Sequence, residues 1–288
     1  MNNISPKWLF LGVLSLVWGS SFILIKKGLV ALTSIQVGSL RIVFAALFLL
    51  LIGFGSLKKI PKNKWKYLAI TAFVGTFLPA FLFAFAQKHI SSAVGAVLNS
   101  LTPMITFLLG IFVFSMGFKK SQIWGVCIGL VGSSILILSG AVAHPEQNYW
   151  YATLIILATT CYGLNVNLIK KHLSDINPVA ITVGNFTVLL FPAVLILIFS
   201  GFFQNIDQVP VQHATFFIAI LGVVGTGIAN ILFFKLIQIS SPVFATSVTY
   251  LIPVVAFCWG FLDGESLSWP QVFGAFVILI GVYLSSKK

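Results

Sequence analysis

Polar and aromatic side chains recur at helical spacing inside long apolar stretches of this 288-residue chain. Asn99, Asn165 and Asn230 lie within such stretches, where an amide is harder to satisfy by local backbone hydrogen bonds than a hydroxyl. Amides, hydroxyls and rings on shared helix faces suit a cavity that binds a small amphipathic solute. The candidate substrate-binding residues are Trp18, Ser21, Arg41, Thr76, Phe83, Gln87, Asn99, Thr102, Tyr162, Asn165, Asn230, Phe234, Thr246 and Tyr250.

Helical periodicity of about 3.6 residues per turn assigns these side chains to faces. Phe83 and Gln87 share one face, Asn230 and Phe234 share another, and Asn167 points away from the face of its stretch. The alternative role is packing, in which such groups hydrogen-bond between helices for about 0.6–2 kcal/mol per pair. Single hydroxyls favour packing, whereas both roles stay open for the three asparagines and for Trp18.

Arg41 is the only arginine and the only basic residue well inside an apolar stretch. It lies about six residues from the outer end of that stretch, roughly 9 Å at 1.5 Å of rise per residue. Its guanidinium group therefore has three possible partners: the outer surface by snorkelling, a backbone carbonyl, or a substrate carboxylate.

The elements that carry these residues are membrane-spanning helices. The chain is 59% hydrophobic and 8% charged, whereas a soluble chain of this length carries about a quarter charged residues. Its formal charge of +12 comes mostly from short lysine clusters between apolar runs, a pattern typical of membrane loops. We therefore expect the lipid bilayer as a partner and no interaction with nucleic acid.

Acid–base and metal chemistry have few candidate residues. No aspartate or glutamate lies in the middle of an apolar stretch, and the four histidines fall in loops or at the ends of stretches. The three cysteines lie inside apolar runs without metal-ligand spacing, and no Ser–His–Asp arrangement is evident. We expect no enzyme activity, no cofactor and no metal.

Ten apolar runs are long enough for a membrane span, which needs about 20 residues. The connections between them are short and leave no room for a soluble domain. Pro79, Pro103 and Pro253 fall inside runs and are candidate hinges, because each frees a backbone carbonyl and can kink its helix. The predicted spans are 7–26, 35–54, 66–86, 93–115, 122–141, 150–169, 178–200, 214–235, 242–262 and 269–285.

The chain consists of two similar halves. Residues 18–27 resemble residues 162–171, 144 positions further on, which predicts repeats over 1–144 and 145–288. Each repeat holds five spans, and because five is odd the second inserts upside down relative to the first. The lysine-rich loop 58–66 accordingly corresponds to a lysine-free loop in the second repeat. The predicted fold is an all-α integral membrane protein with ten transmembrane helices, arranged as two inverted five-helix repeats around a central cavity.

The distribution of basic residues predicts the orientation. With both termini in the cytoplasm, the cytoplasmic side holds 13 basic residues and the outer side holds 3, so this orientation is favoured over its reverse. The cytoplasmic residues are Lys7, Lys58, Lys59, Lys62, Lys64, Lys66, Lys119, Lys120, Lys170, Lys171, Lys235, Lys287 and Lys288; the outer ones are Lys26, Lys27 and Lys88.

The chain resembles the EamA family of the drug/metabolite transporter superfamily. The resemblance rests on the two five-span repeats, the segment 18–22, Arg41, Pro103 and the glycine-rich fifth and tenth spans. The acidic turn 263–265 is similar to the acidic end of the family's ninth span, whereas the first repeat has no acid there. The resemblance implies a multi-pass exporter of metabolites or amino acids in the bacterial inner membrane, with a central cavity between the halves.

The function expected from these patterns is secondary transport of small amphipathic solutes such as amino acids, outward and by alternating access of the two halves. The missing mid-membrane carboxylate favours uniport, substrate exchange or weak coupling over proton-coupled export of cations. The alternatives are an integral-membrane channel and a lipid-acting membrane enzyme. We expect a small-molecule substrate and a monomer or weak homodimer.

Overall fold

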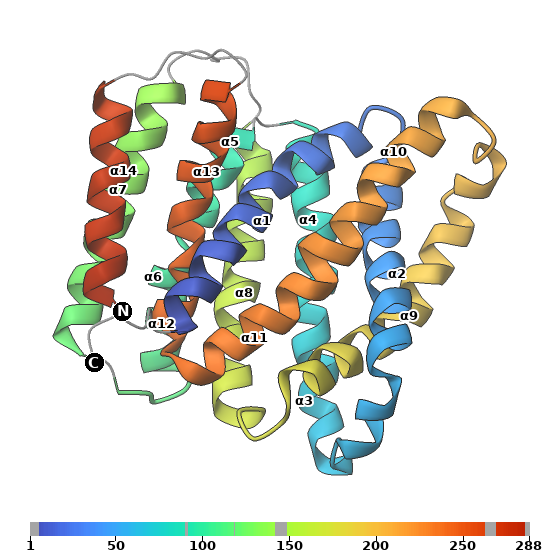
Figure 1. Cartoon of the computed structure of the whole chain (residues 1–288), viewed down its shortest axis with the longest axis horizontal. Coiled ribbons are helices and arrows are strands. Elements are labelled where there is room, and N and C mark those ends of the chain that lie inside the picture. Colours follow the sequence, from blue (N-terminus) through green and yellow to red (C-terminus); the bar gives the residue numbers. More distant parts are fainter. Residues whose placement is uncertain (1–5, 90–91, 118, 142–148, 263–268, 286–288) are drawn as a thin grey trace.

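The computed structural model describes residues 6–89, 92–117, 119–141, 149–262 and 269–285 (Figure 1). Every regular element in these ranges is a helix. The helices of the first half are α1 (Pro6–Gly28), α2 (Ser34–Gly53), α3 (Trp65–Ala72), α4 (Leu78–Gln87), α5 (Ser92–Asn99), α6 (Thr102–Phe112) and α7 (Lys120–Ala141). Those of the second half are α8 (Ala152–His172), α9 (Pro178–Phe199), α10 (Val209–Ile220), α11 (Ala229–Ile239), α12 (Pro242–Thr246), α13 (Val248–Leu262) and α14 (Trp269–Ser285).

Six continuous helices within the described ranges are long and apolar enough to cross a bilayer, as expected for an integral membrane protein. Two of them, which cover the predicted third and eighth spans, join two α-helices through a π-helical segment. The six are Pro6–Gly28, Ser34–Lys59, Lys62–Gln87, Ala152–His172, Pro178–Phe199 and Val209–Ile239. The acidic turn 263–265 and the two chain ends lie outside the described residues.

The predicted spans 93–115 and 242–262 are each broken into two helices. The first break follows from Pro103, whose ring clashes with the carbonyl four residues earlier, that of Asn99, where α5 ends. The Thr102 hydroxyl donates to this freed carbonyl at 2.6 Å. In the second half Ser247 separates α12 from α13, six residues before Pro253 within α13.

Several helices begin at residues whose side chains cap the helix N-terminus. Thr33 and Gln36 form a capping box, in which each side chain bonds the backbone amide of the other, at 3.2 and 2.9 Å. Asn177 caps α9 by accepting from the Val179 amide at 2.9 Å, and Ser241 caps α12 in the same way. A proline follows each of the last two caps, at the first helical position, where a missing amide hydrogen costs nothing.

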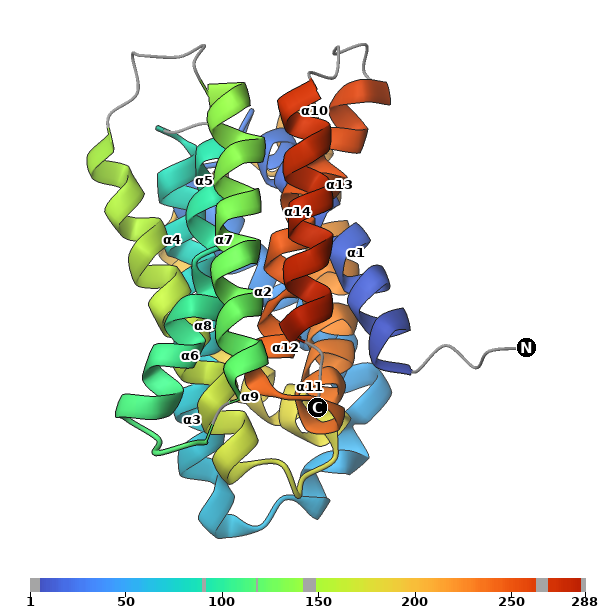
Figure 2. The same cartoon turned by 90° about the vertical axis from the view of Figure 1, so that its left-hand side faces the viewer.

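The helices of the two halves pack against one another rather than forming separate bundles. Helix α1 contacts α10, α11 and α13 of the second half, and α8 contacts α3, α4 and α6 of the first. Helix α2 packs along α9, and α7 packs along α14 at one edge of the molecule (Figures 1 and 2). In Figure 1, α1 runs from the lower to the upper end, whereas α8 runs from the upper to the lower end.

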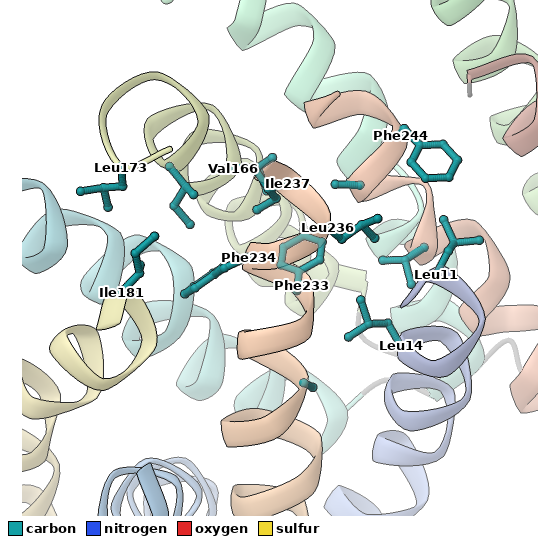
Figure 3. Close-up of a cluster of buried hydrophobic side chains, with 14 of the residues drawn as sticks. Leu11, Leu14, Val166, Leu173, Ile181, Phe233, Phe234, Leu236, Ile237 and Phe244 are labelled. Carbon is teal, nitrogen blue, oxygen red and sulfur yellow. The ribbon is translucent and has the colours of Figure 1, made fainter. Parts of the chain in front are cut away.

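A large hydrophobic cluster lies between α1, α8, α9, α11 and the α12–α13 segment (Figure 3). Its members come from both halves, so this core joins them. It includes Leu11, Leu14, Val166, Leu173, Ile181, Phe233, Phe234, Leu236, Ile237 and Phe244.

Candidate functional site

A cavity lies between the two halves, with a volume of about 100 Å³ available to the centre of a water molecule. All of the predicted binding residues except Phe234 and Tyr250 line it. Helices α1, α2, α4, α6, α8, α11, α12 and α13 contribute to its wall, together with both π-helical segments and the end of α5. The lining residues are Trp18, Ser21, Phe22, Ile25, Arg41, Gly75, Thr76, Phe83, Gln87, Asn99, Thr102, Tyr162, Asn165, Val166, Gly225, Thr226, Asn230, Phe233, Thr246, Thr249 and Ile252.

Phe234 and Tyr250 are buried but belong to the hydrophobic cluster rather than to this wall. Phe234 points from α11 towards Ile181 (Figure 3). The Tyr250 ring packs on Gly129 of α7, and its hydroxyl donates to the Val126 carbonyl at 3.0 Å. Their neighbours Phe233 and Thr249, one residue earlier in each case, line the cavity instead.

The two π-helical segments, Phe73–Phe77 and Leu221–Ile228, bring Thr76 and Thr226 to the cavity wall. Short π-helical stretches often occur at functional sites, because the wider turn alters the hydrogen-bonding pattern of the backbone. The glycines beside these threonines, Gly75 and Gly225, also line the wall. Thr226 lies four positions before Asn230 and shares its helix face, whereas Gly75 and Gly225 were not predicted as lining residues, although Val74-Gly75-Thr76 matches Val224-Gly225-Thr226 between the halves.

Each π-helical segment receives a side chain from the first helix of the other half. The Trp18 indole donates from Nε1 to the Gly225 carbonyl at 2.9 Å. Asn165 of α8 packs directly on Gly75, where an added Cβ would lie 2.5 Å from the Asn165 side chain. Glycine at position 75 therefore leaves room for the Asn165 amide at the wall of the cavity.

The Arg41 side chain reaches the cavity, so it does not have to extend to the outer surface to find a polar partner. Its Nε donates to the Thr226 hydroxyl at 2.6 Å, and the residue lines the wall. No other hydrogen bond or ion pair of Arg41 occurs within the described part of the chain. One N–H of the guanidinium group is thus fixed by the second half, and its terminal nitrogens stay available.

Aromatic rings from both halves line the cavity. Phe83 and Tyr162 stack with ring centroids 6.0 Å apart, and Phe22 meets Phe83 edge-on at 6.5 Å. Trp18 and Phe233 meet edge-on at 5.0 Å. These rings supply apolar contact area with fixed orientation.

Several polar atoms at the wall have no hydrogen-bond partner among the described residues. Both amide atoms of Gln87 are buried without one, and so is the Asn165 carbonyl oxygen Oδ1. Buried polar groups are otherwise nearly always satisfied, so these atoms are available for a ligand. By contrast, the Asn99 Oδ1 lies 3.4 Å from the Thr102 hydroxyl. In the described ranges no group of three or more His, Cys, Asp or Glu residues is arranged to hold a metal ion.

The candidate hinge prolines occupy three different settings. Pro79 and Pro103 lie in the first turns of α4 and α6, directly after a π-helical segment and a helix break. Pro253 lies inside α13. Pro79 and Pro103 therefore mark irregular points of wall-forming helices, and the role of all three prolines as hinges stays a prediction.

A helical protein with several membrane-spanning segments and a polar cavity between its halves has the architecture of a membrane transporter. A sequence model of the EamA-like transporter family matches residues 6–138 and again residues 149–287. The chain belongs to this family, which confirms the resemblance found in the sequence. The family consists of transporters, so the interpretation as a transporter rather than an enzyme holds.

Known proteins are similar over nearly the whole chain. The identity is 26% to the "Uncharacterized inner membrane transporter YedA" of Escherichia coli, over 99% of this chain and 94% of that protein. It is 24% to the "Probable amino-acid metabolite efflux pump" of Salmonella typhimurium, over 93% and 91%. It is also 24% to the "S-adenosylmethionine/S-adenosylhomocysteine transporter" of Chlamydia trachomatis, over 93% and 85%.

A solved crystal structure has the same fold, with a TM-score of 0.74 over 97% of this chain and 96% of the other. The identity between these two chains is 16%, so the likeness concerns the fold alone.

Proposed function

We propose that this protein is a secondary transporter that moves small amphipathic solutes, such as amino acids, outward across the bacterial inner membrane by alternating access. The observation that carries the proposal is the cavity between the halves, lined by uncharged polar groups, aromatic rings and Arg41. Both halves contribute to its wall. Rocking of one half against the other would therefore expose the site to either side in turn.

Three observations support a fold of ten spans in two inverted repeats, over residues 1–144 and 145–288. The family model matches twice, once in each half. The packing is reciprocal, since α1 meets α10 and α11 while α8 meets α3 and α4. The opposite directions of α1 and α8 fit an inversion (Figure 1).

The arrangement of lysines supports cytoplasmic termini. The start of α1, the segment before α3, the start of α7 and the end of α8 lie at the lower end of the molecule in Figure 1. Most of the described lysines belong to these segments, whereas Lys26, Lys27 and Lys88 belong to the ends of α1 and α4 at the upper end. By the positive-inside rule the lower end faces the cytoplasm. The name of the Escherichia coli relative supports the inner membrane.

The names of two relatives support an amphipathic substrate. The Salmonella protein is named as an amino-acid metabolite efflux pump and the Chlamydia protein as a carrier of S-adenosyl compounds. The first name also supports outward movement. None of the described lining residues is an aspartate or glutamate, so uniport, substrate exchange or weak coupling fits better than proton-coupled export of cations.

A counterflow assay tests this function against the channel and the lipid-acting enzyme. Purified protein is reconstituted into vesicles that hold an excess of one unlabelled amino acid, and labelled amino acid is added outside at low concentration. A transporter produces a transient internal accumulation of label. A channel gives only equilibration, and an enzyme acting on lipid gives altered lipid and no accumulation.

A matched pair of tryptophan variants links the assay to the cavity. Ser21→Trp fills the cavity from α1, and Val13→Trp adds the same group on an exposed position of that helix. We expect the Ser21 variant to lose counterflow and the Val13 variant to keep it. Equal activity in both variants would contradict transport through this cavity.

A further inference from the structure

We propose that the transported solute is a zwitterionic amino compound with an apolar side group, whose carboxylate pairs with Arg41 and whose ammonium group donates to the amide oxygens of Gln87 and Asn165. This inference rests on the proposed function and names the substrate class of the same cavity. Three features of the cavity support it. Among the described residues the Arg41 cation has no counter-ion, the amide oxygens of Gln87 and Asn165 accept no hydrogen bond, and aromatic rings line part of the wall.

The positive charge of Arg41 has no negative partner in the described part of the chain. The salt bridge found there joins Lys64 to Asp175, in the segments before α3 and after α8. Desolvating a guanidinium ion without a counter-charge is costly, and intramembrane arginines normally pair with an anion or a carbonyl. The hydroxyl of Thr226 is neutral, so it orients Arg41 without compensating the charge.

The bond from Nε to Thr226 also determines how an anion can approach. Arginine has five N–H donors, one on Nε and four on the two terminal nitrogens. Because Nε is occupied, a carboxylate meets the terminal nitrogens end-on, as a fork of two parallel hydrogen bonds. Lysine in place of Arg41 would keep the charge and lose this paired geometry.

The amide oxygens supply the complementary half of the site. Asn165 is 3% exposed, its Oδ1 accepts no hydrogen bond from the described residues, and it lines the cavity on Gly75. Gln87 lies one turn after Phe83 on α4 with both amide atoms unpaired. A solute with an ammonium group satisfies such acceptors, whereas a simple inorganic anion leaves them unsatisfied. This favours an organic zwitterion over chloride or phosphate.

The rings of Phe22, Phe83 and Tyr162 give the apolar part of the solute a surface to lie against. The cavity thus offers an anion site, a donor-accepting site and an apolar wall together. Amino acids with aliphatic or aromatic side chains carry the matching groups on one small molecule.

The test uses chemically matched probes on the purified full-length protein. One set is L-phenylalanine, 2-phenylethylamine and 3-phenylpropanoate; the other is L-leucine, 3-methylbutylamine and 4-methylpentanoate. Apparent affinity is read from the shift of the unfolding temperature with probe concentration. We expect at least one amino acid to bind more tightly than its amine and its acid, with chloride and phosphate producing no saturable shift.

Variants of Arg41 and Gln87 test which residue binds the carboxylate of the solute and which binds its ammonium group. We expect Arg41→Gln to weaken amino-acid binding by about 30-fold or more, as for loss of one partner of a buried charge pair. Lys235→Gln removes a charge from an exposed position and should leave the affinity unchanged. Gln87→Met keeps the side-chain length. It should weaken binding of the amino acid while leaving the affinity for 3-phenylpropanoate unchanged.

Three results would overturn the proposal: an amine that binds as tightly as its parent amino acid, retained affinity in Arg41→Gln, or no binding by any carboxylate probe. Loss of affinity in Arg41→Gln counts only if the unfolding temperature without probe stays near that of the wild type. Otherwise Thr226→Val, which releases the guanidinium group but keeps the charge, replaces it and should also weaken binding. Counterflow of some other solute class would leave the transport function standing while this assignment fails.

Discussion

The ammonium group of Lys170 donates to the backbone carbonyl of Ser240 at 2.7 Å. The same group reaches the carbonyls of Ile237 and Gln238 at 3.0 and 3.1 Å, where α11 ends and its dipole favours a cation. Lys170 therefore ties α8 to α11, two helices that line the cavity, at the lower end of the molecule. Its counterpart in the first half, Lys26, is exposed and forms no such bond within the described residues.

The first prediction is that Lys170→Gln shifts the protein towards a state open at the lower end. Hydrogen bonds to a charged group contribute about 1.5–3 kcal/mol each, so losing even one of them shifts a two-state equilibrium by roughly 10- to 150-fold. A single cysteine at Ser21, in a background without Cys127, Cys161 and Cys258, reports access to the cavity. In the proposed orientation the lower end faces the cytoplasm, so labelling from that side should accelerate in Lys170→Gln and stay unchanged in Lys235→Gln.

The second prediction concerns the opposite state. If the halves exchange conformations, Lys26 should cap the end of α4 as Lys170 caps α11, and His89 takes the place of Gln238 by its position in the repeat. Cysteines introduced in pairs, at Lys26 and His89 or at Lys170 and Gln238, should then crosslink in mutually exclusive states. A bound amino-acid substrate that traps one state should raise the crosslinking yield of one pair and lower that of the other. Simultaneous full crosslinking of both pairs in one molecule would argue against alternating access.

The third prediction tests the support of the π-helical segment. Trp18→Phe keeps a ring against Phe233 and removes the donor to the Gly225 carbonyl, so unfolding should become easier by about 0.5–1.5 kcal/mol. Counterflow should slow, because Gly225 and Thr226 form part of the cavity wall. Trp8→Phe is the control, since Trp8 makes an edge contact with Phe244 outside the cavity. Equal effects on transport in both variants would contradict a special role for Trp18.

Most of the candidate binding residues lie at the wall of the cavity, and the two that do not are each next to a residue that does. One turn after Asn230, Phe233 lines the cavity and the predicted Phe234 does not. One turn after Thr246, Thr249 lines it and the predicted Tyr250 does not. Positions i+3 and i+4 lie about 60° and 40° to either side of residue i on a helix, so spacing alone does not choose between them. Helix tilt and local breaks decide, and these depend on tertiary packing.

The irregular segments were partly encoded in the sequence. Pro103 predicted a disturbance, and the break after Asn99 agrees with the steric demand of its ring. No proline accompanies the π-helical segment Leu221–Ile228, so that feature lacked a comparable local signal. Arg41 left three partners open, and only the geometry identified the Thr226 hydroxyl.

The fourth prediction is a pH effect outside the membrane. The Lys64 ammonium group hydrogen-bonds the Asp175 carboxylate at 2.9 Å and lowers the pKa of Asp175 below its ordinary value of 3.8. Because the folded value is the lower one, the pair stabilises the fold above the unfolded pKa, and this stabilisation is lost as the pH falls through the folded value. The Asp175 side chain is 60% exposed, so solvent limits the effect to about 1 kcal/mol or less.

Unfolding temperatures of wild type, Asp175→Asn, Lys64→Gln and the double variant measure this pair. At pH 7 each single variant should be slightly less stable than wild type, and the double variant should cost less than the sum of the singles. As the pH falls through the folded-state pKa of Asp175, the difference between wild type and Asp175→Asn should disappear. A difference that persists there would assign the loss to something other than the carboxylate charge.

The fifth prediction concerns the close approach of α7 and α14. A Cβ on Gly281 would collide with the backbone of Gly129, so small residues here let the two helix backbones approach each other. Gly281→Ala should force the helices apart and destabilise the protein by about 1–3 kcal/mol, as overpacking does. Gly12→Ala makes the same change in α1, where nothing lies within 4 Å of the new Cβ. Alanine there should be neutral or stabilise by up to about 1 kcal/mol, because it favours the helix. Thermal unfolding of the two variants side by side separates helix–helix packing from helix propensity, and equal shifts would contradict the tight α7–α14 contact.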